Sequence, residues 1–510
     1  MSDDQAATIA FLAEPATHDG APVERIDTHG AVVFLTPTRA YKLKRAVRFS
    51  YMDFSTVDRR EAACRAELVV NRRTAPTLYL GVRSIVTRDG GLAFGDADRR
   101  DALDWVVVMR RFDGASQFDR LAAAQRLDEA LVRRLAAAVA AFHRDEPAVR
   151  ATFGGAEGLQ RVVDENRHEF AQRADVLPRA TVAAVDAACR TALEGLTLPL
   201  DRRRAEGCVR RCHGDLHLAN ICLVDGAPTL FDAIEFNDDI AIIDTLFDLA
   251  FLLMDLELRV DAAHANAALN AYLEILPEGD GLRALPLMLA LRAGIRAHTR
   301  AAAAVAAPDA AARASVADDA RGYLDRALGY LAPERPRLVA IGGVSGSGKT
   351  TLARALAPRL ARAPGAVILR SDVVRKALAG VAPTERLGPA HYTAGMSARV
   401  YAELLARSAA ILDAGRSVVV DAVHQRDDER RAIAAVAARA GLRFDGLWLD
   451  PDAGEAAQRI ARRRDDASDA TADVLGQQLA RDTGDLSAWH RIDARGEPSQ
   501  VAARAMVAIS

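Results

Sequence analysis

The segment CHGDLHLANIC, residues 212–222, gathers side chains that could do chemistry, and its residue types allow two different sites. In one, cysteine and histidine side chains are soft ligands of a metal ion. In the other, His213-Gly214-Asp215 and Asn220 form a phosphate-transfer loop, in which a carboxylate accepts a proton and an amide oxygen holds a cation. The two sites require different folds, so the choice between them bears on the whole chain.

The metal site is the weaker of the two interpretations. Its potential ligands are Cys208, Cys212, His213, His217 and Cys222. A tetrahedral zinc site normally takes its ligands as paired short spacings around a turn, and the sequence contains no Cys-x-x-Cys pair. We therefore expect these residues to serve another purpose.

The phosphate-transfer interpretation accounts for more residues. The spacing from Asp215 to Asn220 is that of the catalytic loop H-R-D-x-x-x-x-N. Asp232 lies twelve residues beyond Asn220, at the end of a short strand, where a metal-binding aspartate is expected. Asp215 would accept the proton of an acceptor hydroxyl, while Asn220 and Asp232 would hold Mg²⁺ on a nucleotide.

A second set of phosphate-handling residues lies in GGVSGSGKTT, residues 342–351. The pattern Gly-x-x-x-x-Gly-Lys-Thr follows an apolar strand and opens a helix, which is the context that a P-loop requires. Lys349 would reach the β- and γ-phosphates of ATP, and Thr350 would offer its hydroxyl to Mg²⁺. The loop amides would cradle phosphate oxygens, so the expected ATP-binding residues are Gly343, Val344, Ser345, Gly346, Ser347, Gly348, Lys349, Thr350 and Thr351.

Further charged residues suggest how this nucleotide is used. Asp372 lies at a strand end, where it suits a general base, and Arg375 one helical turn later would bind a polar or anionic group of the substrate. Asp421 ends another apolar strand and would organise Mg²⁺. Arg459 and Arg463, at i,i+4 spacing, would close over the transferring phosphoryl group and act in catalysis. The plain alternatives are a solvated helix face for the arginines and a helix cap for Asp372.

The elements that must position these residues divide the chain into residues 1–332 and 333–510. The boundary falls at YLAPERPRLVAIGG, where two prolines precede an apolar strand. In the first domain, β-branched strands predict a sheet-rich small lobe over about 20–113. Helical periodicity then predicts a larger lobe over about 114–332, so the domain is α+β.

The second domain alternates apolar strands with amphipathic helices, beginning with RLVAIGG and TTLARALAPRLARA. This alternation predicts an α/β fold with a doubly wound parallel sheet, the fold class of P-loop NTPases. In such a sheet the ligand binds at the carboxyl ends of the strands. The glycine loop, Asp372 and Asp421 all occupy such positions.

The string HGDLHLAN resembles the aminoglycoside phosphotransferase family, whose members have a protein-kinase-like fold and phosphorylate hydroxyls of small molecules. The resemblance implies that Lys42 in RAYKLK binds phosphate, with Lys44 on the same strand face as its competitor. It also implies that Glu67 pairs with this lysine, that Met109 lies at the hinge beside adenine, and that Asp248 supports the catalytic loop. For Lys42 and Glu67 the alternative is a pair of solvated side chains.

One feature of that family, a glycine-rich loop over the phosphates, is missing. The stretch before Lys42 offers only Gly30 in its place.

Residues 337–510 resemble the small P-loop kinases, a group that includes gluconate, polynucleotide and antibiotic-modifying kinases. The order of the two domains is similar to a bacterial arrangement described as a bifunctional phosphotransferase and ATP-binding protein. The resemblance implies ATP and Mg²⁺ at both sites and a small-molecule substrate.

Composition sets further bounds on partners and location. With 67 basic and 69 acidic residues, the net charge of −2 offers no broad attraction for nucleic acid or anionic lipid. The N-terminus lacks a positively charged leader, and three aspartates interrupt the most apolar window, residues 240–258, so we expect a buried helix rather than a membrane span. Five cysteines fit a reducing compartment. We expect a cytoplasmic protein that acts on small molecules; its oligomeric state cannot be read from the sequence.

These observations predict an ATP-dependent phosphotransferase with two Mg·ATP sites. Two other hypotheses stay open. One is a nucleotide-gated regulator whose first domain is a degenerate kinase that senses a metabolite, against which the complete trio of Asp215, Asn220 and Asp232 argues. The other is a toxin-like kinase of nucleotide sugars or nucleic-acid ends. No constellation in the sequence identifies the acceptor.

Overall fold

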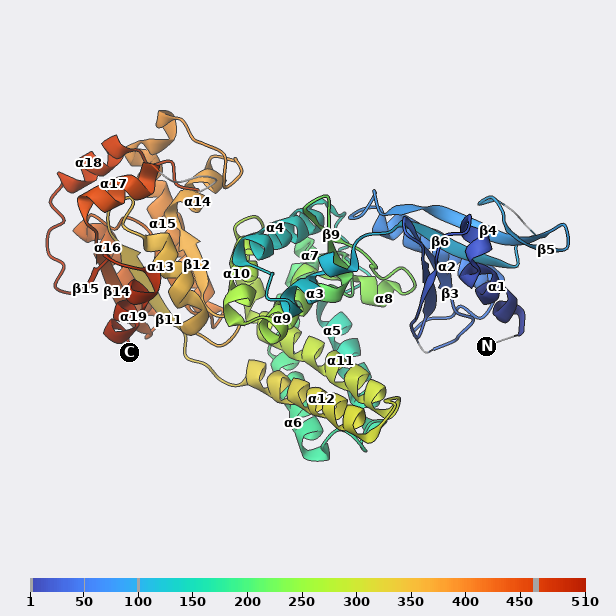
Figure 1. Cartoon of the computed structure of the whole chain (residues 1–510). Helices are drawn as coiled ribbons and strands as arrows, with labels where there is room; N and C mark the ends of the chain where they lie inside the picture. Colours follow the sequence, from blue (N-terminus) through green and yellow to red (C-terminus); the bar gives the residue numbers. More distant parts are fainter. Residues whose placement is uncertain (1–2, 50, 99–100, 462–466) are drawn as a thin grey trace. The chain divides into compact units, whose positions relative to one another are not determined.

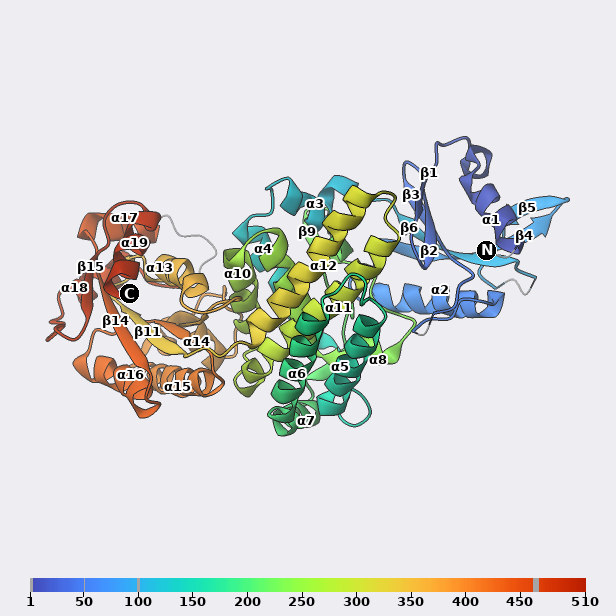
Figure 2. The ribbon, with the colours of Figure 1, turned by 90° about the horizontal axis from the view of Figure 1, so that it is seen from below.

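The computed structural model describes residues 3–49, 51–98, 101–461 and 467–510, and Figures 1 and 2 show the chain from two sides. It forms two compact units that do not follow the order of the chain. The first comprises Met1–Leu127, Phe142–Gly158 and Arg203–Leu252, and the second comprises Asp128–Ala141, Leu159–Arg202 and Leu253–Ser510.

The first unit contains a six-stranded antiparallel sheet in the order β1-β2-β3-β6-β4-β5. Side chains of a strand point alternately to the two faces. Tyr41 and Leu43 therefore pack against α1, while Ala40 packs on the α2 face (Figure 2). The elements are α1 (Asp3–Ala13), β1 (Glu24–Asp27), β2 (Ala31–Leu35), β3 (Arg39–Lys44), α2 (Val57–Asn71), β4 (Tyr79–Arg88), β5 (Gly91–Phe94) and β6 (Asp104–Arg110).

Short elements later in this unit hold the HGDLHLAN loop. Strand β7 pairs antiparallel with β10, and β8 pairs antiparallel with β9. The loop connects β7 of the first pair to β8 of the second. The elements are α3 (Phe118–Ala123), β7 (Val209–Arg211), β8 (Ile221–Val224), β9 (Ala227–Leu230), α8 (Asp238–Ala241), β10 (Ile242–Asp244) and α9 (Thr245–Arg259), the last of which continues into the second unit.

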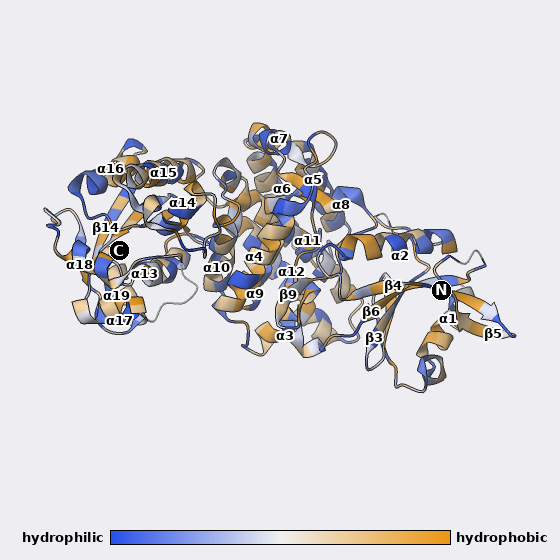
Figure 3. Cartoon of the chain, turned by 90° about the horizontal axis from the view of Figure 1, so that it is seen from above, coloured by the Kyte–Doolittle hydropathy of each residue, from blue (hydrophilic) through white to orange (hydrophobic). Residues whose placement is uncertain are grey.

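The remaining helices of the first sequence half lie largely in the second unit. Helix α11 packs against α12 and α6, and its alanine-rich face is buried, which allows close approach of the helices (Figure 1). In Figure 3, α12 carries both hydrophobic and hydrophilic residues, as an amphipathic helix does. These helices are α4 (Glu129–Asp145), α5 (Gly155–Ala171), α6 (Arg179–Glu194), α7 (Thr197–Glu206), α10 (Ala262–Leu273), α11 (Leu285–Val305) and α12 (Ala310–Leu331).

The second unit also contains a sheet of five parallel strands in the order β12-β13-β11-β14-β15. Helices α13 and α19 cover one face, and α15 and α16 cover the other (Figure 2). The elements are β11 (Arg337–Gly342), α13 (Lys349–Leu356), β12 (Val367–Arg370), α14 (Ser371–Leu378), α15 (Ala394–Asp413), β13 (Val418–Asp421), α16 (Asp427–Arg439), β14 (Arg443–Asp450), α17 (Ala453–Ala461), α18 (Ala472–Leu479), β15 (His490–Asp493) and α19 (Pro498–Ala508).

Strand β12 is an edge strand, and side chains of α10 satisfy its outer backbone groups. Asn270 Oδ1 accepts from the Ile368 amide at 2.7 Å, and its Nδ2 donates to the Ala366 carbonyl at 3.3 Å. Asn266 Nδ2 donates to the carbonyls of Pro364, at 2.7 Å, and Ala366, at 2.9 Å. Both asparagines are buried, so α10 takes the place of a sixth strand.

The fold class predicted from the sequence is confirmed: a protein-kinase-like α+β fold precedes a P-loop fold with a doubly wound parallel sheet. The apolar window 240–258 contains β10 and most of α9, whose residues are largely buried. In the described parts of the chain, no helix combines the length and apolar character needed to cross a membrane.

Candidate active sites

Two lysines of β3 and one glutamate of α2 form the centre of the first site. Glu67 is fully buried and binds Lys42 Nζ at 2.9 Å through Oε1 and Lys44 Nζ at 2.5 Å through Oε2. The lysines differ in their second partner: Lys42 pairs with Asp232, whereas Lys44 pairs with Glu235 at 2.5 Å. Only Lys42 therefore reaches an aspartate that the sequence marks as a metal ligand.

The charges of this cluster compensate one another. Burial alone would lower the pKa of Lys42, but Asp232 and Glu67 raise it well above its ordinary value. Burial would raise the pKa of Asp232, and Lys42 brings it below the ordinary value instead. The pair is therefore an ammonium and a carboxylate at neutral pH, the form in which Asp232 can exchange the lysine for a cation.

The polar residues of the HGDLHLAN loop converge on Asp215. Asn220 Nδ2 donates to Asp215 Oδ2 and to the Asp215 carbonyl, both at 3.0 Å, and His217 Nε2 lies 3.3 Å from the same carboxylate oxygen. The β8–β9 hairpin returns the chain so that the Phe231 amide donates to the Asn220 carbonyl at 3.0 Å. Asp232 thus comes directly beside Asn220.

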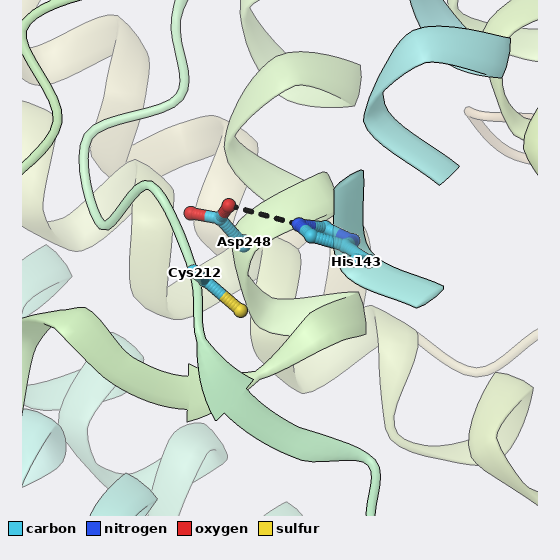
Figure 4. Close-up of side chains that lie close together, drawn as sticks. All are labelled: His143, Cys212 and Asp248. Atoms are coloured by element: carbon cyan, nitrogen blue, oxygen red, sulfur yellow. Dashed lines mark hydrogen bonds and ion pairs between the residues drawn. The ribbon is translucent and has the colours of Figure 1, made fainter. Parts of the chain in front are cut away.

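The buried carboxylate of Asp248 holds the backbone of this loop in place. Asp248 accepts from the amides of His213, at 3.0 Å, and Gly214, at 2.9 Å, and its Oδ2 lies 3.1 Å from His143 Nε2 (Figure 4). Gly214 has φ +84°, and a Cβ there would lie 2.9 Å from Ile234, so only glycine fits. The loop conformation is thereby fixed independently of any ligand.

The residues considered for a metal cluster take other roles. Figure 4 shows Cys212 beside His143 and Asp248, a group whose donor atoms lie within 4.8 Å of one another. Both oxygens of Asp248 already accept from backbone amides, and Cys212 Sγ donates to the Ile243 carbonyl at 3.5 Å. His213 Nε2 lies 2.9 Å from the Phe231 carbonyl, and burial lowers the pKa of its imidazole. We read the group as a hydrogen-bonded brace.

An apolar cluster lies where β3 begins and β6 ends. Ala40 and Met109 are paired across these strands, and both are buried. They share a cluster with Val33, Leu35, Phe112 and Phe231. Strands β1 and β2 are joined by a tight turn in which the Thr28 amide donates to the Ala31 carbonyl at 2.9 Å, where a protein kinase has its glycine-rich loop.

The glycine cradle of the second site follows β11 directly. Gly343, Gly346 and Gly348 have φ of +136°, +81° and +95°, conformations that favour glycine. A Cβ on Gly346 would lie 2.4 Å from the Ala456 carbonyl, and one on Gly343 would lie 2.9 Å from the Leu449 carbonyl. Both glycines are therefore required by close approach as well as by backbone angle.

Lys349, Thr350 and Asp421 meet at this cradle. Lys349 Nζ donates to the carbonyls of Gly343, at 2.8 Å, and Val344, at 2.9 Å. The Thr350 hydroxyl donates to Asp421 Oδ2 at 2.6 Å. Strands β11 and β13 are adjacent and parallel, which brings the hydroxyl after one strand to the carboxylate ending the other.

Asp372 and Arg375 lie on the first turns of α14. Burial raises the pKa of the Asp372 carboxyl; Arg370 opposes this shift, and Asp421 adds to it. The Arg375 guanidinium lies over the Tyr392 ring, 4.9 Å from its centroid, and donates to the His391 carbonyl at 3.0 Å. Both residues thus follow the carboxyl end of β12 directly.

Of the two arginines expected to act in catalysis, Arg459 and Arg463, the structure describes Arg459. Arg459 binds Glu455 at 2.9 Å and the Ala494 carbonyl at 3.3 Å, and a Cβ on Gly348 would lie 3.8 Å from its Nη1. It therefore lies beside the cradle. Arg463 lies outside the described residues. Thr351 follows the cradle on an exposed side of α13.

Sequence reasoning missed several partners of these residues. Gln478 Oε1 accepts from the Ser345 amide at 2.7 Å, so one cradle amide is filled by a side chain of the protein. Glu235 binds Lys44, and Arg370 Nε lies 3.7 Å from Asp421 Oδ2. Arg370 and Glu235 stand within two or three residues of predicted site residues, whereas nothing in the sequence singles out Gln478.

Comparison with known families assigns both halves. The Phosphotransferase enzyme family matches residues 59–285, and an AAA domain family matches residues 338–483. The first match contains Glu67 and the HGDLHLAN loop, and the second contains the whole glycine cradle.

Two uncharacterized proteins match this chain over most of their length. The chain is 31% identical to the uncharacterized proteins Rv2004c of Mycobacterium tuberculosis and Mb2027c of Mycobacterium bovis, over 95% of its own length and 94% of theirs. Among solved structures, it is similar to a choline/ethanolamine kinase family protein from Mesorhizobium loti (16% identity, 64% of this chain and 95% of that one, TM-score 0.40). It is also similar to a gluconokinase from Sinorhizobium meliloti (20% identity, 34% and 93%, TM-score 0.26).

Proposed function

The chain belongs to the family of Rv2004c, and in this chain the phosphotransferase-family match precedes the AAA domain match; from this premise we propose that it is an ATP-dependent phosphotransferase with two separate Mg·ATP sites. Domains of these two kinds transfer phosphoryl groups. The proposal adds that both sites bind ATP and that at least one phosphorylates a hydroxyl of a small molecule.

The observation that carries the proposal for the first site is the convergence of Lys42, Asp215, Asn220 and Asp232 from three separate segments. Asp215 is held by Asn220 and would take the proton of an acceptor hydroxyl. Lys42, oriented by Glu67, would bind the α- and β-phosphates. Ala40 and Met109 of the apolar cluster would contact adenine.

In the second site the cradle amides and Lys349 would hold the β- and γ-phosphates. Asp372 would take the proton of the acceptor, and its raised pKa suits a base better than that of an ordinary aspartate. Arg375 would bind a polar or anionic group of the acceptor, and Arg459 would neutralise charge on the phosphoryl group. Arg463 would assist from outside the described residues.

The oxygen ligands in both sites fit Mg²⁺. Asp232 and the amide oxygen of Asn220 would hold it in the first site, and the Thr350 hydroxyl and Asp421 would hold it in the second. Bound Mg²⁺ would neutralise the phosphates and orient the γ-phosphate for in-line attack. The other residues would position the reactants and move the proton.

The test is ATP turnover by the full chain and by three variants: Lys349→Ala, Asp215→Ala and both together. We expect each single change to remove one part of the turnover and the double change to remove nearly all of it. Asp98→Asn, on an exposed loop, is the matched control. Unchanged ATP binding and turnover in both single variants would refute the proposal. A metabolite panel with each variant would then identify the acceptors.

The regulator hypothesis keeps one specific observation in its favour, the tight β1–β2 turn where a glycine-rich loop would cover the phosphates. Under this hypothesis the first site binds nucleotide without transferring phosphate. Isothermal titration of the Lys349→Ala variant with ATP distinguishes the two. Tight binding without transfer to any member of the metabolite panel would favour the regulator.

The balanced charge and the five free cysteines fit an intracellular small-molecule enzyme.

A further inference from the structure

Helix α18 packs directly on the phosphate cradle. Leu475 of α18 shares a buried apolar cluster with Val344 of the cradle and Ala456 of α17. One turn later, Gln478 Oε1 accepts a hydrogen bond from the Ser345 amide at 2.7 Å. The helix is therefore joined to the cradle by an apolar contact and by a polar one, three residues apart on the same helix face.

The Ser345 amide belongs to the same peptide unit as the Val344 carbonyl, and that carbonyl accepts from Lys349 Nζ at 2.9 Å. A trans peptide is planar, with its N–H and C=O pointing in opposite directions. Gln478 and Lys349 therefore hold opposite ends of one rigid group. A hydrogen bond at one end polarises the peptide and strengthens the bond at the other.

Gln478 is itself held in place by the segment after β13. Gln425 Nε2 donates to the Gln478 carbonyl at 2.6 Å, and Gln425 is buried. It follows the candidate Mg²⁺ ligand Asp421 by four residues. The backbone of α18 is thus fixed relative to the strand that carries this carboxylate, and the side-chain amide of Gln478 is aimed at the cradle.

We propose that Gln478 is a positioning residue for the P-loop lysine, which it controls through the Val344–Ser345 peptide. The inference rests on the proposed function of this site. Without Gln478 the peptide can rotate, and the Lys349 ammonium then loses one of the two carbonyls that hold it at the cradle. Lys349 would sample positions from which it cannot bridge the β- and γ-phosphates, so that transfer slows more than nucleotide binding weakens.

The test uses the full chain with Asp215→Ala, so that turnover reports the second site alone. Gln478→Met keeps the size and helix propensity of the side chain but removes the acceptor. Losing one hydrogen bond in the transition state should lower kcat about tenfold, with ADP affinity unchanged. Gln478→Glu keeps the acceptor and should hold kcat within about threefold while its charge raises the KM for ATP. Gln477→Met, on the exposed side of α18, should leave both constants at the parent values.

A double-mutant cycle tests whether Gln478 acts through Lys349. Gln478→Met should lower kcat less in a Lys349→Arg background, which keeps a cation and measurable turnover, than in the Asp215→Ala parent. The inference would be overturned by any one of three results. These are full additivity of the two substitutions, a kcat of Gln478→Met equal to that of the parent, and an equal loss of kcat in Gln478→Met and Gln478→Glu. Turnover that does not depend on Lys349 at all would instead refute the proposed function of the site, so the two failures are distinguishable.

Discussion

At the scale of single residues, the two sites solve the same problem with different side chains. In the proposed function, each would place a lysine on the phosphates, an aspartate at the acceptor and oxygen ligands around Mg²⁺. In the first site Lys42 is held by the buried Glu67, whereas in the second Lys349 is held by backbone carbonyls. Loss of Glu67 would leave buried charge uncompensated, whereas the carbonyls that hold Lys349 are part of the cradle itself.

The raised pKa of Asp372 predicts the pH dependence of the second site. A general base acts in its deprotonated form, so turnover by the Asp215→Ala variant should rise with pH through the Asp372 pKa. Since burial raises this pKa, the acid limb of kcat/KM should lie above the ordinary aspartate range. Asp372→Asn should remove this limb and lower kcat/KM by about 10²- to 10⁴-fold. Retention of the limb in Asp372→Asn would exclude Asp372 as the base.

At the scale of elements, the position of each site follows from strand pairing. The β8–β9 hairpin sets Asp232 beside Asn220, and the parallel pairing of β11 with β13 sets Thr350 against Asp421. The shape of the cradle depends also on helix α17, because the Ala456 carbonyl of that helix packs against Gly346.

Gly346→Ala should therefore disable the second site. The new Cβ would lie 2.4 Å from the Ala456 carbonyl, and the residue would keep a left-handed backbone. We expect a loss of about 1–3 kcal/mol in the free energy of unfolding and loss of Lys349-dependent turnover. Gly476→Ala, in α18 with no atom within 4 Å of its Cβ position, is the control and should be neutral or slightly stabilising. Wild-type turnover in Gly346→Ala would show that the cradle can shift without loss of function.

At the scale of the whole molecule, the domain boundary predicted from the sequence differs from the division of the structure into compact units. The proline-flanked linker predicts a second domain over 333–510, a boundary that stays a prediction. The second compact unit extends beyond it and includes the helices from Leu253 to Leu331. Asn266 and Asn270 of α10 explain this extension, because they bind the outer edge of β12.

A fragment of residues 253–510 should therefore unfold at higher urea concentration than one of residues 333–510. The shorter fragment loses several hydrogen bonds to β12, each of which contributes about 1 kcal/mol, and exposes an edge strand. Introducing Asn266→Ala and Asn270→Ala into the longer fragment should remove most of the difference. Equal midpoints for the two fragments would show that α10 does not stabilise the sheet.

The sequence by itself determined the two folds and nearly all the residues proposed for chemistry. Phosphate-binding groups lie close together in the chain, as in the cradle and in HGDLHLAN, and strand and helix periodicity is a local property. It did not reveal α1, the β1–β2 turn, or the helix that covers the edge of β12.

Only the tertiary structure decided which carboxylate each β3 lysine meets, since Lys42 and Lys44 share a strand face and differ only in their contacts with Asp232 and Glu235. It likewise decided that Gln478 reaches Ser345, a residue more than a hundred positions earlier. Such contacts depend on how separate elements pack, and an exposed-looking glutamine or asparagine in a helix carries no local signal of its distant partner.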